Sequence, residues 1–443
     1  MLNIAVQVIF VGCHDRPTPS VQDNRSTNSS TRAVTRANPE AGSRFTVAIV
    51  CVLPLEYDAL AAILDGQPQV LPHDADRFIY TTGVLAGREV VIAYPEDYGP
   101  RDAALAVQSL EQKYGNMNLI ILFGICAGVP MPPGREKPIY LGDVIICTAV
   151  LAYAHGARKN PAGLELREMF PEKARGKIRQ IHRLLATEAF SGDLAVSSRN
   201  GLGQLSNIKT RYRLLRADED LFFDPSYHHL HRSHCPANKC DARTPDICQI
   251  AEETSCQELQ CDTGCLARRR PSYETTPLGI HSGVFASADM IMRDAQVRDD
   301  LVRKHKVLAF DMEATGIWDL SPHVVVIKGV CDYGDSHKNK QWQDLAAAHA
   351  ACTAKGFIET FFPKGNDEFD IEQVTACSAG INEWACSQMF SLCCLGAGVA
   401  LGIKASLIRG RGSWVEQFSF ASVDNSLLLL LLLFLLSYLY YAA

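Results

Sequence analysis

The hydrophobic pattern along the chain alternates between strand-like and helix-like segments from residue 45 onward. Residues 45–53 (FTVAIVCVL) are β-branched and apolar, which predicts a buried strand, and residues 55–66 have helical spacing and end at Gly66. The alternation continues with strands expected at 88–95, 118–130, 142–153, 279–287 and 323–335, and helices at 101–115, 298–306, 313–320 and 341–362. Buried strands that alternate with helices predict a three-layer α/β/α sandwich with a central mixed β-sheet.

Three regions depart from this pattern. Residues 1–43 are rich in Ser, Thr, Asn, Pro and Arg and predict a disordered leader; their first apolar run lacks the features of a signal peptide. Residues 228–270 form a polar, Cys/His-rich insertion in the domain at 44–364. Residues 365–443 form an apolar tail that has lost the alternation.

Overall composition is that of a globular protein, with 47% hydrophobic and 21% charged residues. The formal net charge is −6. Proteins that bind phosphate backbones normally carry a basic excess, so nucleic acid is not expected as the main partner.

Polar residues follow several of the expected strands, where ligands collect in open α/β sheets. Glu56 comes after the first strand, a glycine loop at 124–128 ends another, and Asp311 and Glu313 follow the apolar run VLAF. Each has a structural alternative: a helix N-terminus favours acidic residues, and close packing also requires glycine. Asp332 ends a largely apolar strand, where desolvation would raise its pKa and suit it to general-acid catalysis.

The order of these segments resembles the purine nucleoside phosphorylase and nucleosidase superfamily, which has the PNP/UDP phosphorylase fold. The resemblance is carried by VAIVCVLPLEYDAL, GICAGVP with LGDVII, GVFASADMIMRDAQVRDDL, and LAFDMEATGIWDL with VVVIKGVCDYGDSHKNKQWQDLAAAHAA. These segments lie between residues 44 and 362. The chain looks most like the variety found as a module in NACHT/ankyrin receptor-like proteins.

This resemblance implies a role for each matching residue. Asp332 matches the acid that protonates the leaving purine, and Glu56 matches the glutamate that activates water in the nucleosidases. The remaining matches are the ribose-binding residues Glu313, Met312 and Asp311, the base-packing residues Ile291, Met292 and Phe285, and the glycine-loop residues Gly124, Cys126 and Gly128. Cleavage of an N-glycosidic bond passes through an oxocarbenium-like sugar, which explains the need for an acid, hydroxyl acceptors and a nucleophile.

Water is favoured over phosphate as the nucleophile. Phosphorylases of this superfamily bind phosphate with arginines and a hydroxyl, whereas this chain has Leu122 and Ile125 at the glycine loop and no arginine in the first loop. A buried phosphate would lack charge-assisted partners there. We therefore expect a purine nucleosidase; a phosphorolytic enzyme and a catalytically weak nucleoside- or nucleotide-sensing module remain alternatives.

A basic cluster follows the expected acid. His337, Lys338 and Lys340 could contact the phosphate chain of a nucleotide, or could belong to an ordinary solvated loop. The arginines at 268–270 could face the same opening. The group on the 5′ carbon of the substrate therefore stays open.

The insertion holds six of the sixteen cysteines. The spacing of Cys235, Cys240, Cys256, Cys261 and Cys265 is at the wide limit of the spacings seen in structural zinc sites. The histidines at 228, 229, 231 and 234 could supply nitrogen ligands. Reduced, unliganded thiols and disulfides are the alternatives, and no cofactor is expected to be required for catalysis.

Two further expectations concern location and assembly. The charge-free stretch at 425–443 is long enough to cross a bilayer, so it is either a membrane anchor or a leucine-biased tail without that role. The protein is otherwise expected to be cytoplasmic. The resemblance implies a homo-oligomer that acts on a small purine nucleoside or nucleotide.

Overall fold

A ten-stranded mixed sheet forms the centre of the protein. The computed structural model describes residues 45–364 except 72–77, 116, 161–162, 171–175, 233–234, 237–239, 241–246 and 339, together with 404–410 and 413–419. The strand order is β11-β10-β6-β12-β5-β1-β4-β3-β2, and β7 pairs with β6. The strands are β1 (Val47–Val50), β2 (Gln69–Val70), β3 (Ile79–Leu85), β4 (Arg88–Tyr94), β5 (Leu119–Gly128), β6 (Val144–Asn160), β7 (Gly163–Phe170), β10 (Ile280–Ser287), β11 (Val307–Asp311) and β12 (Val324–Asp332).

The central strands are buried on both faces because helices cover the sheet on each side. All residues of β1 and β12 are buried, as the continuous apolar runs of the sequence predict. β12 pairs in parallel with β5, and β5 pairs in parallel with β1. β5 also pairs in antiparallel fashion with β11 at Ala127 and Gly128, so one half of the sheet curls back on itself.

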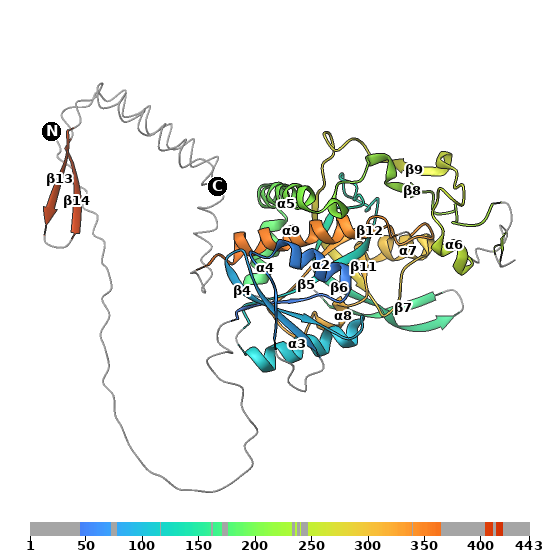
Figure 1. Ribbon diagram of the computed structural model, residues 1–443, viewed down its shortest axis with the longest axis horizontal. Helices are drawn as coiled ribbons and strands as arrows, with labels where there is room; N and C mark the ends of the chain where they lie inside the picture. The colour runs from blue at the N-terminus through green and yellow to red at the C-terminus, as the bar shows by residue number, and fades with distance from the viewer. Residues whose placement is uncertain are drawn as a thin grey trace, which may run out of the picture.

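Two groups of helices enclose the sheet, and they lie on opposite sides of it (Figure 1). On one side α2 (Pro54–Ile63) and α5 (Glu188–Ile208) pack against α9 (Gln343–Phe361); on the other α3 (Pro100–Tyr114) packs against α8 (Ala314–Ile317). The close approach of α9 to β12 requires glycine at 329, because a Cβ there would lie 2.0 Å from the Ala346 carbonyl oxygen. The expected three-layer architecture is therefore confirmed.

Most of the expected elements are present, with a few differences. The helix expected at 313–320 is reduced to the short α8, and Pro322 disfavours helical backbone just beyond it. The expectations did not include α4 (Lys177–Leu185) or α5. The helix expected at 298–306 is α7 (Ala295–His305), which Asp294 caps by accepting from the backbone N–H groups of Gln296 and Val297.

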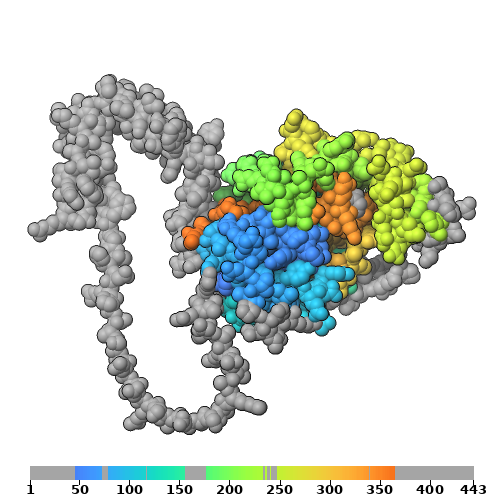
Figure 2. Space-filling view, in the orientation of Figure 1, coloured from blue at the N-terminus to red at the C-terminus, as the bar shows by residue number. Residues whose placement is uncertain are grey.

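A two-stranded antiparallel sheet joins β8 (Leu221–Phe223), which precedes the insertion, to β9 (Leu266–Arg269), which lies at its end. Between these strands the only described α-helix is the five-residue α6 (Gln249–Glu253). The insertion lies at one end of the molecule, in green and yellow in Figure 2. Regular secondary structure therefore contributes little to its fold.

Two expectations fall outside the described residues. The leader at 1–43 and the apolar stretch at 425–443 are both in this category. Within the part of the chain that the structure describes, no helix has the length and apolarity needed to cross a membrane. In the tail, β13 (Lys404–Gly410) and β14 (Ser413–Ser419) form an antiparallel hairpin.

Candidate active site

A cavity of about 280 Å³ lies at the carboxyl ends of β1, β5, β11 and β12, and we call it the strand-end cavity. Its walls bring together residues from segments that are far apart in the sequence. The lining residues are Val52, Leu53, Glu56, Tyr98, Ile125, Cys126, Ala127, Met290, Ile291, Met292, Phe310, Asp311, Met312, Glu313, Cys331, Lys338 and Gln343. The structure thus places Glu56, Asp311, Met312 and Glu313 around one space, as the sequence predicts for a ligand site.

Glu56 is fixed by backbone donors from two segments. Its Oε2 accepts from the N–H groups of Val52 and Leu53, both at 3.0 Å, and its Oε1 accepts from the N–H of Ile125 at 2.9 Å. Burial raises the pKa of Glu56, and the nearby Glu313 raises it further, while Lys328 lowers it. A buried carboxylate held in this way is oriented and is a stronger base than an exposed one.

Glycine at 124 makes room for this carboxylate. A Cβ at that position would lie 2.1 Å from Glu56 Oε1. Neither Gly124 nor Gly128 lines the cavity, and a Cβ at Gly128 would lie 2.6 Å from Cγ1 of Val330. The glycine loop therefore serves the packing of Glu56 and the strands, while Cys126 forms part of the cavity wall.

Lys328 balances the charge of the acidic wall. Its fully buried ammonium lies 2.9 Å from Glu313 Oε2 and also interacts with Glu56 and Asp311. Burial lowers the pKa of Lys328, but the three carboxylates outweigh this effect and raise it above its ordinary value. The sequence analysis did not identify this residue, although a lone lysine inside a buried strand must find a charged partner.

Asp311 has one oxygen in a hydrogen bond with the backbone, and the Ser287 hydroxyl also interacts with this carboxylate. Its Oδ2 accepts from the Ala314 N–H at 3.0 Å, at the start of α8, and its buried Oδ1 has no hydrogen-bond partner among the described residues. Burial raises the pKa of Asp311 to about 6; Lys328 lowers it, Glu313 raises it, and the Ser287 hydroxyl lowers it. An unpartnered buried acceptor that lines a cavity is available to a ligand hydroxyl.

Asp332 lies beside the cavity, not in its wall. Its neighbours Cys331 and Lys338 line the cavity, and Asp332 Oδ2 pairs with Lys338 Nζ at 2.6 Å. Its Oδ1 accepts from the Gly334 N–H at 2.9 Å. Both oxygens of Asp332 therefore have partners within the protein.

Of the three residues expected to pack the base, two line the strand-end cavity and one does not. Ile291 and Met292 line the cavity, together with Met290, which the sequence analysis did not single out. Phe285 does not line it: its side chain is fully buried in the main hydrophobic core. Phe285 is in β10 and points into the core because side chains alternate between the two faces of a strand.

Of the three residues in the expected basic cluster, only one lines the strand-end cavity. Lys338 lines the cavity, whereas Lys340 is exposed and does not. His337 points away into a group of cysteines and histidines, where its Nδ1 lies 3.5 Å from Cys256 Sγ and its Nε2 lies 2.8 Å from the Tyr227 carbonyl oxygen. Neither His337 nor Lys340 is placed to contact a phosphate chain in this cavity.

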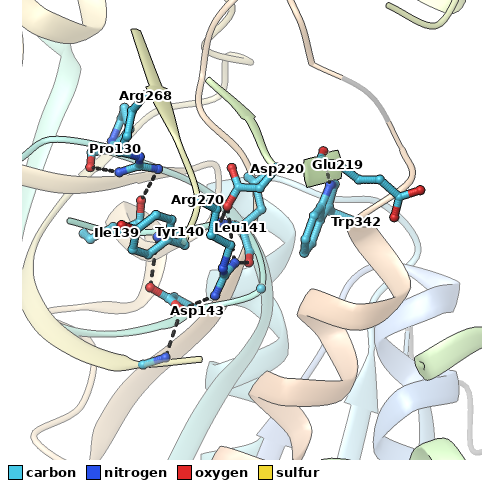
Figure 3. A network of polar contacts seen from close by, with 12 residues as sticks. Pro130, Ile139, Tyr140, Leu141, Asp143, Glu219, Asp220, Arg268, Arg270 and Trp342 are labelled. Carbon is cyan, nitrogen blue, oxygen red and sulfur yellow. Dashed lines mark hydrogen bonds and ion pairs between the residues drawn. The ribbon is translucent and has the colours of Figure 1, made fainter. Parts of the chain in front are cut away.

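The arginines at 268–270 do not face the cavity. Figure 3 shows Arg268 and Arg270 reaching from the end of the insertion to the segment before β6. Arg268 donates to the carbonyl oxygens of Pro130 and Ile139, and the buried Arg270 pairs with Asp220 at 3.3 Å. Arg268 and Arg270 therefore connect the insertion to the domain that contains the ten-stranded sheet.

A second cavity of about 460 Å³ shares the wall formed by Met290, Ile291 and Met292. It lies between α7 and the insertion, and its other lining residues include Tyr227, His228 and Val297. The segment at 290–292 therefore separates the strand-end cavity from the insertion.

The cysteines and histidines of the insertion form two compact groups. One contains His229, Cys256, Cys261 and His337, and the other contains His231, Cys235, Cys240 and Cys248. Cys265 was a candidate ligand but lies outside both groups, as does His228; His234 is not described. All the described cysteines are free thiols, so no disulfide joins them.

Comparison with known families supports the resemblance. Residues 46–201 match the family described as the phosphorylase superfamily. This match confirms the family identification for that part of the chain. It includes Glu56 and the glycine loop but ends before Asp311, Glu313 and Asp332, so the roles of these three residues remain predictions.

Among curated proteins, the chain is similar to a nucleotide-binding leucine-rich repeat (NLR)-like protein from Hyaloscypha variabilis. The two are 26% identical over 324 residues, which are 71% of this chain and 29% of that protein. The chain thus spans less than a third of the length of this relative.

Two solved structures illustrate the wider similarity. The 5′-methylthioadenosine/S-adenosylhomocysteine nucleosidase from Neisseria meningitidis is 16% identical, with coverage of 71% of this chain and 98% of that chain and a TM-score of 0.41. The futalosine hydrolase of Helicobacter pylori is 12% identical, with coverage of 71% and 98% and a TM-score of 0.39.

Proposed function

We propose that this protein hydrolyses the N-glycosidic bond of a purine nucleoside. The observation that carries the proposal is the acidic wall of the strand-end cavity. Glu56, Asp311 and Glu313 line it, and Lys338 is the only cationic side chain among its described lining residues. An acidic wall stabilises the positive charge that develops on the sugar as the bond to the base breaks.

Glu56 is the proposed base for the attacking water. Three backbone N–H groups fix its carboxylate, and burial raises its pKa. The water would give a proton to Glu56 as its oxygen bonds to the anomeric carbon. The base would leave with the electron pair of the broken bond.

Glu313 and Asp311 are the proposed partners of the sugar hydroxyls. Lys328 holds Glu313 through one oxygen, and Asp311 has an oxygen without a protein donor. Met312 lies between these two residues in the same wall. Two carboxylate acceptors on neighbouring positions match a vicinal diol, which is the recognition element of ribose.

Asp332 is the proposed acid for the leaving purine, on the basis of the resemblance. Lys338 occupies one oxygen of this carboxylate, so this pair must open for Asp332 to reach the base. A protonated Asp332 would then give its proton to the five-membered ring of the purine. Ile291 and Met292 would pack against the base.

Hydrolysis is favoured over phosphorolysis by the electrostatics of the cavity. A phosphate ion would have to lie among three carboxylates, with Lys338 already paired to Asp332. Ile125, at the glycine loop, contributes an apolar side chain to the wall. Water carries no charge and meets no such repulsion.

The same charge argument favours a nucleoside over a nucleotide. His337 is engaged with the cysteines, and Lys340 does not line the cavity. Among the described residues, no cluster of unpaired cations lies at this cavity to bind a 5′-phosphate chain. The expected substrate has an uncharged 5′ group.

The direct test follows release of free purine by the full-length protein from adenosine, methylthioadenosine and ATP, each with and without phosphate. We expect release from the two nucleosides without phosphate. Asp332→Asn should lower turnover by about 10²–10⁴-fold while substrate binding persists. Release that requires phosphate, or full activity of the variant, would refute the mechanism.

A sensing module is the second candidate, because the following observations favour it. The proposed acid is paired with Lys338 and lies outside the cavity wall, and the NLR-like relative is more than three times longer than the matched segment. Binding of nucleosides by the wild-type protein, with no purine release from any substrate, would establish this alternative.

A further inference from the structure

We propose that this protein binds two zinc ions, one in each of its Cys/His groups, and that the first ion fixes the loop that carries Lys338. Site A consists of His229, Cys256, Cys261 and His337; site B consists of His231, Cys235, Cys240 and Cys248. In each group the four ligand atoms lie within 4.8 Å of one another.

The spacing within site A matches a tetrahedral zinc ion. Zn–S and Zn–N distances of about 2.3 and 2.05 Å place adjacent sulfur and nitrogen ligands about 3.6 Å apart. The Sγ atom of Cys256 lies 3.6 Å from His229 Nδ1 and 3.5 Å from His337 Nδ1, and Cys261 Sγ lies 3.4 Å from His229 Nδ1. These three separations match edges of a zinc tetrahedron, and the four ligand atoms all lie within 4.8 Å of one another.

Both histidines of site A already present the nitrogen that a metal requires. His229 Nε2 lies 2.9 Å from the Thr254 carbonyl oxygen, and His337 Nε2 lies 2.8 Å from that of Tyr227. A carbonyl accepts only from a protonated nitrogen, so each ring carries a proton on Nε2, and the neutral ring then has its lone pair on Nδ1. Such second-shell hydrogen bonds are typical of metal-binding histidines.

Site B has the same geometry with one more thiolate. His231 Nδ1 lies 3.4 Å from Cys240 Sγ and 3.7 Å from Cys248 Sγ, and Cys235 Sγ lies 3.7 Å from Cys248 Sγ. The expected separation of two thiolates on a tetrahedral zinc is about 3.8 Å. Backbone N–H groups of Cys240 and Ala251 point at the sulfurs of Cys235 and Cys248 and would stabilise thiolates.

The insertion needs these ions because its own apolar core is very small. The cluster at its centre contains Ala251, Leu259 and Ile247, and its other members are cysteines. Among the described residues between β8 and β9, regular structure is limited to short helical segments. Small segments with so little core are commonly held by metal ions, and the donor set of thiolates and imidazoles selects zinc.

Site A joins the insertion to the strand-end cavity. His337 is adjacent to Lys338, which lines the cavity and pairs with Asp332. The His337 ring also stacks on Phe223, with ring centroids 4.0 Å apart, and the His337 backbone N–H donates to Asp335 Oδ1. A metal at site A would therefore fix one end of the loop at 332–338, whereas a metal at site B contacts only the insertion.

The test measures metal content in the full-length protein purified without chelators from zinc-supplemented medium. We expect two zinc ions per chain, one in Cys256→Ser, one in Cys240→Ser and none in the double variant. Cys265→Ser and His228→Ala are matched controls, because both residues lie in the insertion outside the two groups, and should keep two. Wild-type protein without zinc, or with iron in its place, would overturn the proposal, as would unchanged zinc in both ligand variants.

A second measurement covers variants that fail to fold. Wild-type protein stripped with a chelator should take up two cobalt ions and gain thiolate-to-cobalt charge-transfer absorption; no such absorption would contradict thiolate ligation. Hydrogen exchange separates the two sites. In Cys256→Ser the peptide at 331–343 should exchange about tenfold faster, and in Cys240→Ser it should not change. Equal exchange in both variants would refute the link between site A and the loop.

Discussion

In the strand-end cavity, regular secondary structure positions the functional groups. In the insertion, the Cys and His side chains lie on irregular segments and are positioned mainly by their contacts with each other. Glu56 is held by three backbone N–H groups, and Glu313 lies two residues after the end of β11. The two Cys/His groups instead collect residues from irregular segments between β8 and β9, with His337 from the sheet domain. A sheet can therefore position a polar site without a ligand, while we propose that the irregular insertion requires one.

If this comparison is correct, substitutions in the cavity should leave the zinc content unchanged. The largest expected effect is on activity, in Glu56→Gln. The amide cannot accept a proton from water, so we expect turnover to fall by about 10²–10⁴-fold. Purine release and metal content, measured on the same preparation, check both statements. Loss of zinc from this variant would show that the cavity and the insertion are not independent.

The next effect is on stability, in Lys328→Met. Removal of the buried ammonium leaves Glu313, Asp311 and Glu56 without their shared cation. Loss of one partner of a buried ion pair costs about 3–5 kcal/mol, which urea denaturation would measure.

Two further variants test the interpretation of this result. The double variant Lys328→Met/Glu313→Gln should recover part of the lost stability, because it removes one of the stranded charges. Lys137→Ala breaks an exposed pair with Glu188 and should leave the Tm unchanged. A Lys328→Met protein as stable as the wild type would contradict the charge balance described for the cavity.

A smaller effect concerns the pH dependence of stability. Burial raises the pKa of Asp311 to about 6 from an ordinary value of 3.8. The folded protein therefore binds this proton more tightly than the unfolded chain, so Asp311 favours folding most at low pH. That contribution is lost as the pH rises from about 4 to about 6, by on the order of 2 kcal/mol.

Asp311→Asn isolates this contribution. The amide oxygen can still accept from the Ala314 N–H, so the cap of α8 is kept. Denaturation curves between pH 4 and 7 should show a wild-type loss of stability that is reduced in the variant. Parallel curves for the two proteins would rule out an unusual titration of Asp311 in the folded state.

The sequence predicted the cavity better than the insertion for a physical reason. Glu56, Asp311 and Glu313 could be identified because strand ends meet at one edge of a parallel sheet. Lys328 carried a signal that the analysis did not use, a charge within a buried strand. Phe285 was misplaced because a resemblance between sequences does not state which face of β10 each side chain occupies.

In the insertion, the sequence predicted the chemistry but not the grouping. Spacing along the chain suggested five cysteines, yet the structure pairs Cys256 and Cys261 with His337, which lies more than 70 residues further along. It also excludes Cys265 and includes Cys248. Contacts between distant irregular segments leave no periodic pattern, so only the three-dimensional structure can reveal them.

The smallest expected effect concerns the wall that the cavity shares with its larger neighbour. Ile291 lines both cavities and is 47% exposed in the absence of substrate. Truncation to alanine removes part of the proposed contact with the base. Because this contact exists in both the bound ground state and the transition state, KM should rise by about fivefold with kcat unchanged.

Val297→Ala is the matched control for Ile291→Ala. Val297 is 46% exposed and lines only the larger of the two cavities. If the substrate occupies the strand-end cavity, KM should respond to Ile291→Ala alone. An equal rise in both variants would place part of the substrate between α7 and the insertion, and zinc-site variants would then affect binding directly.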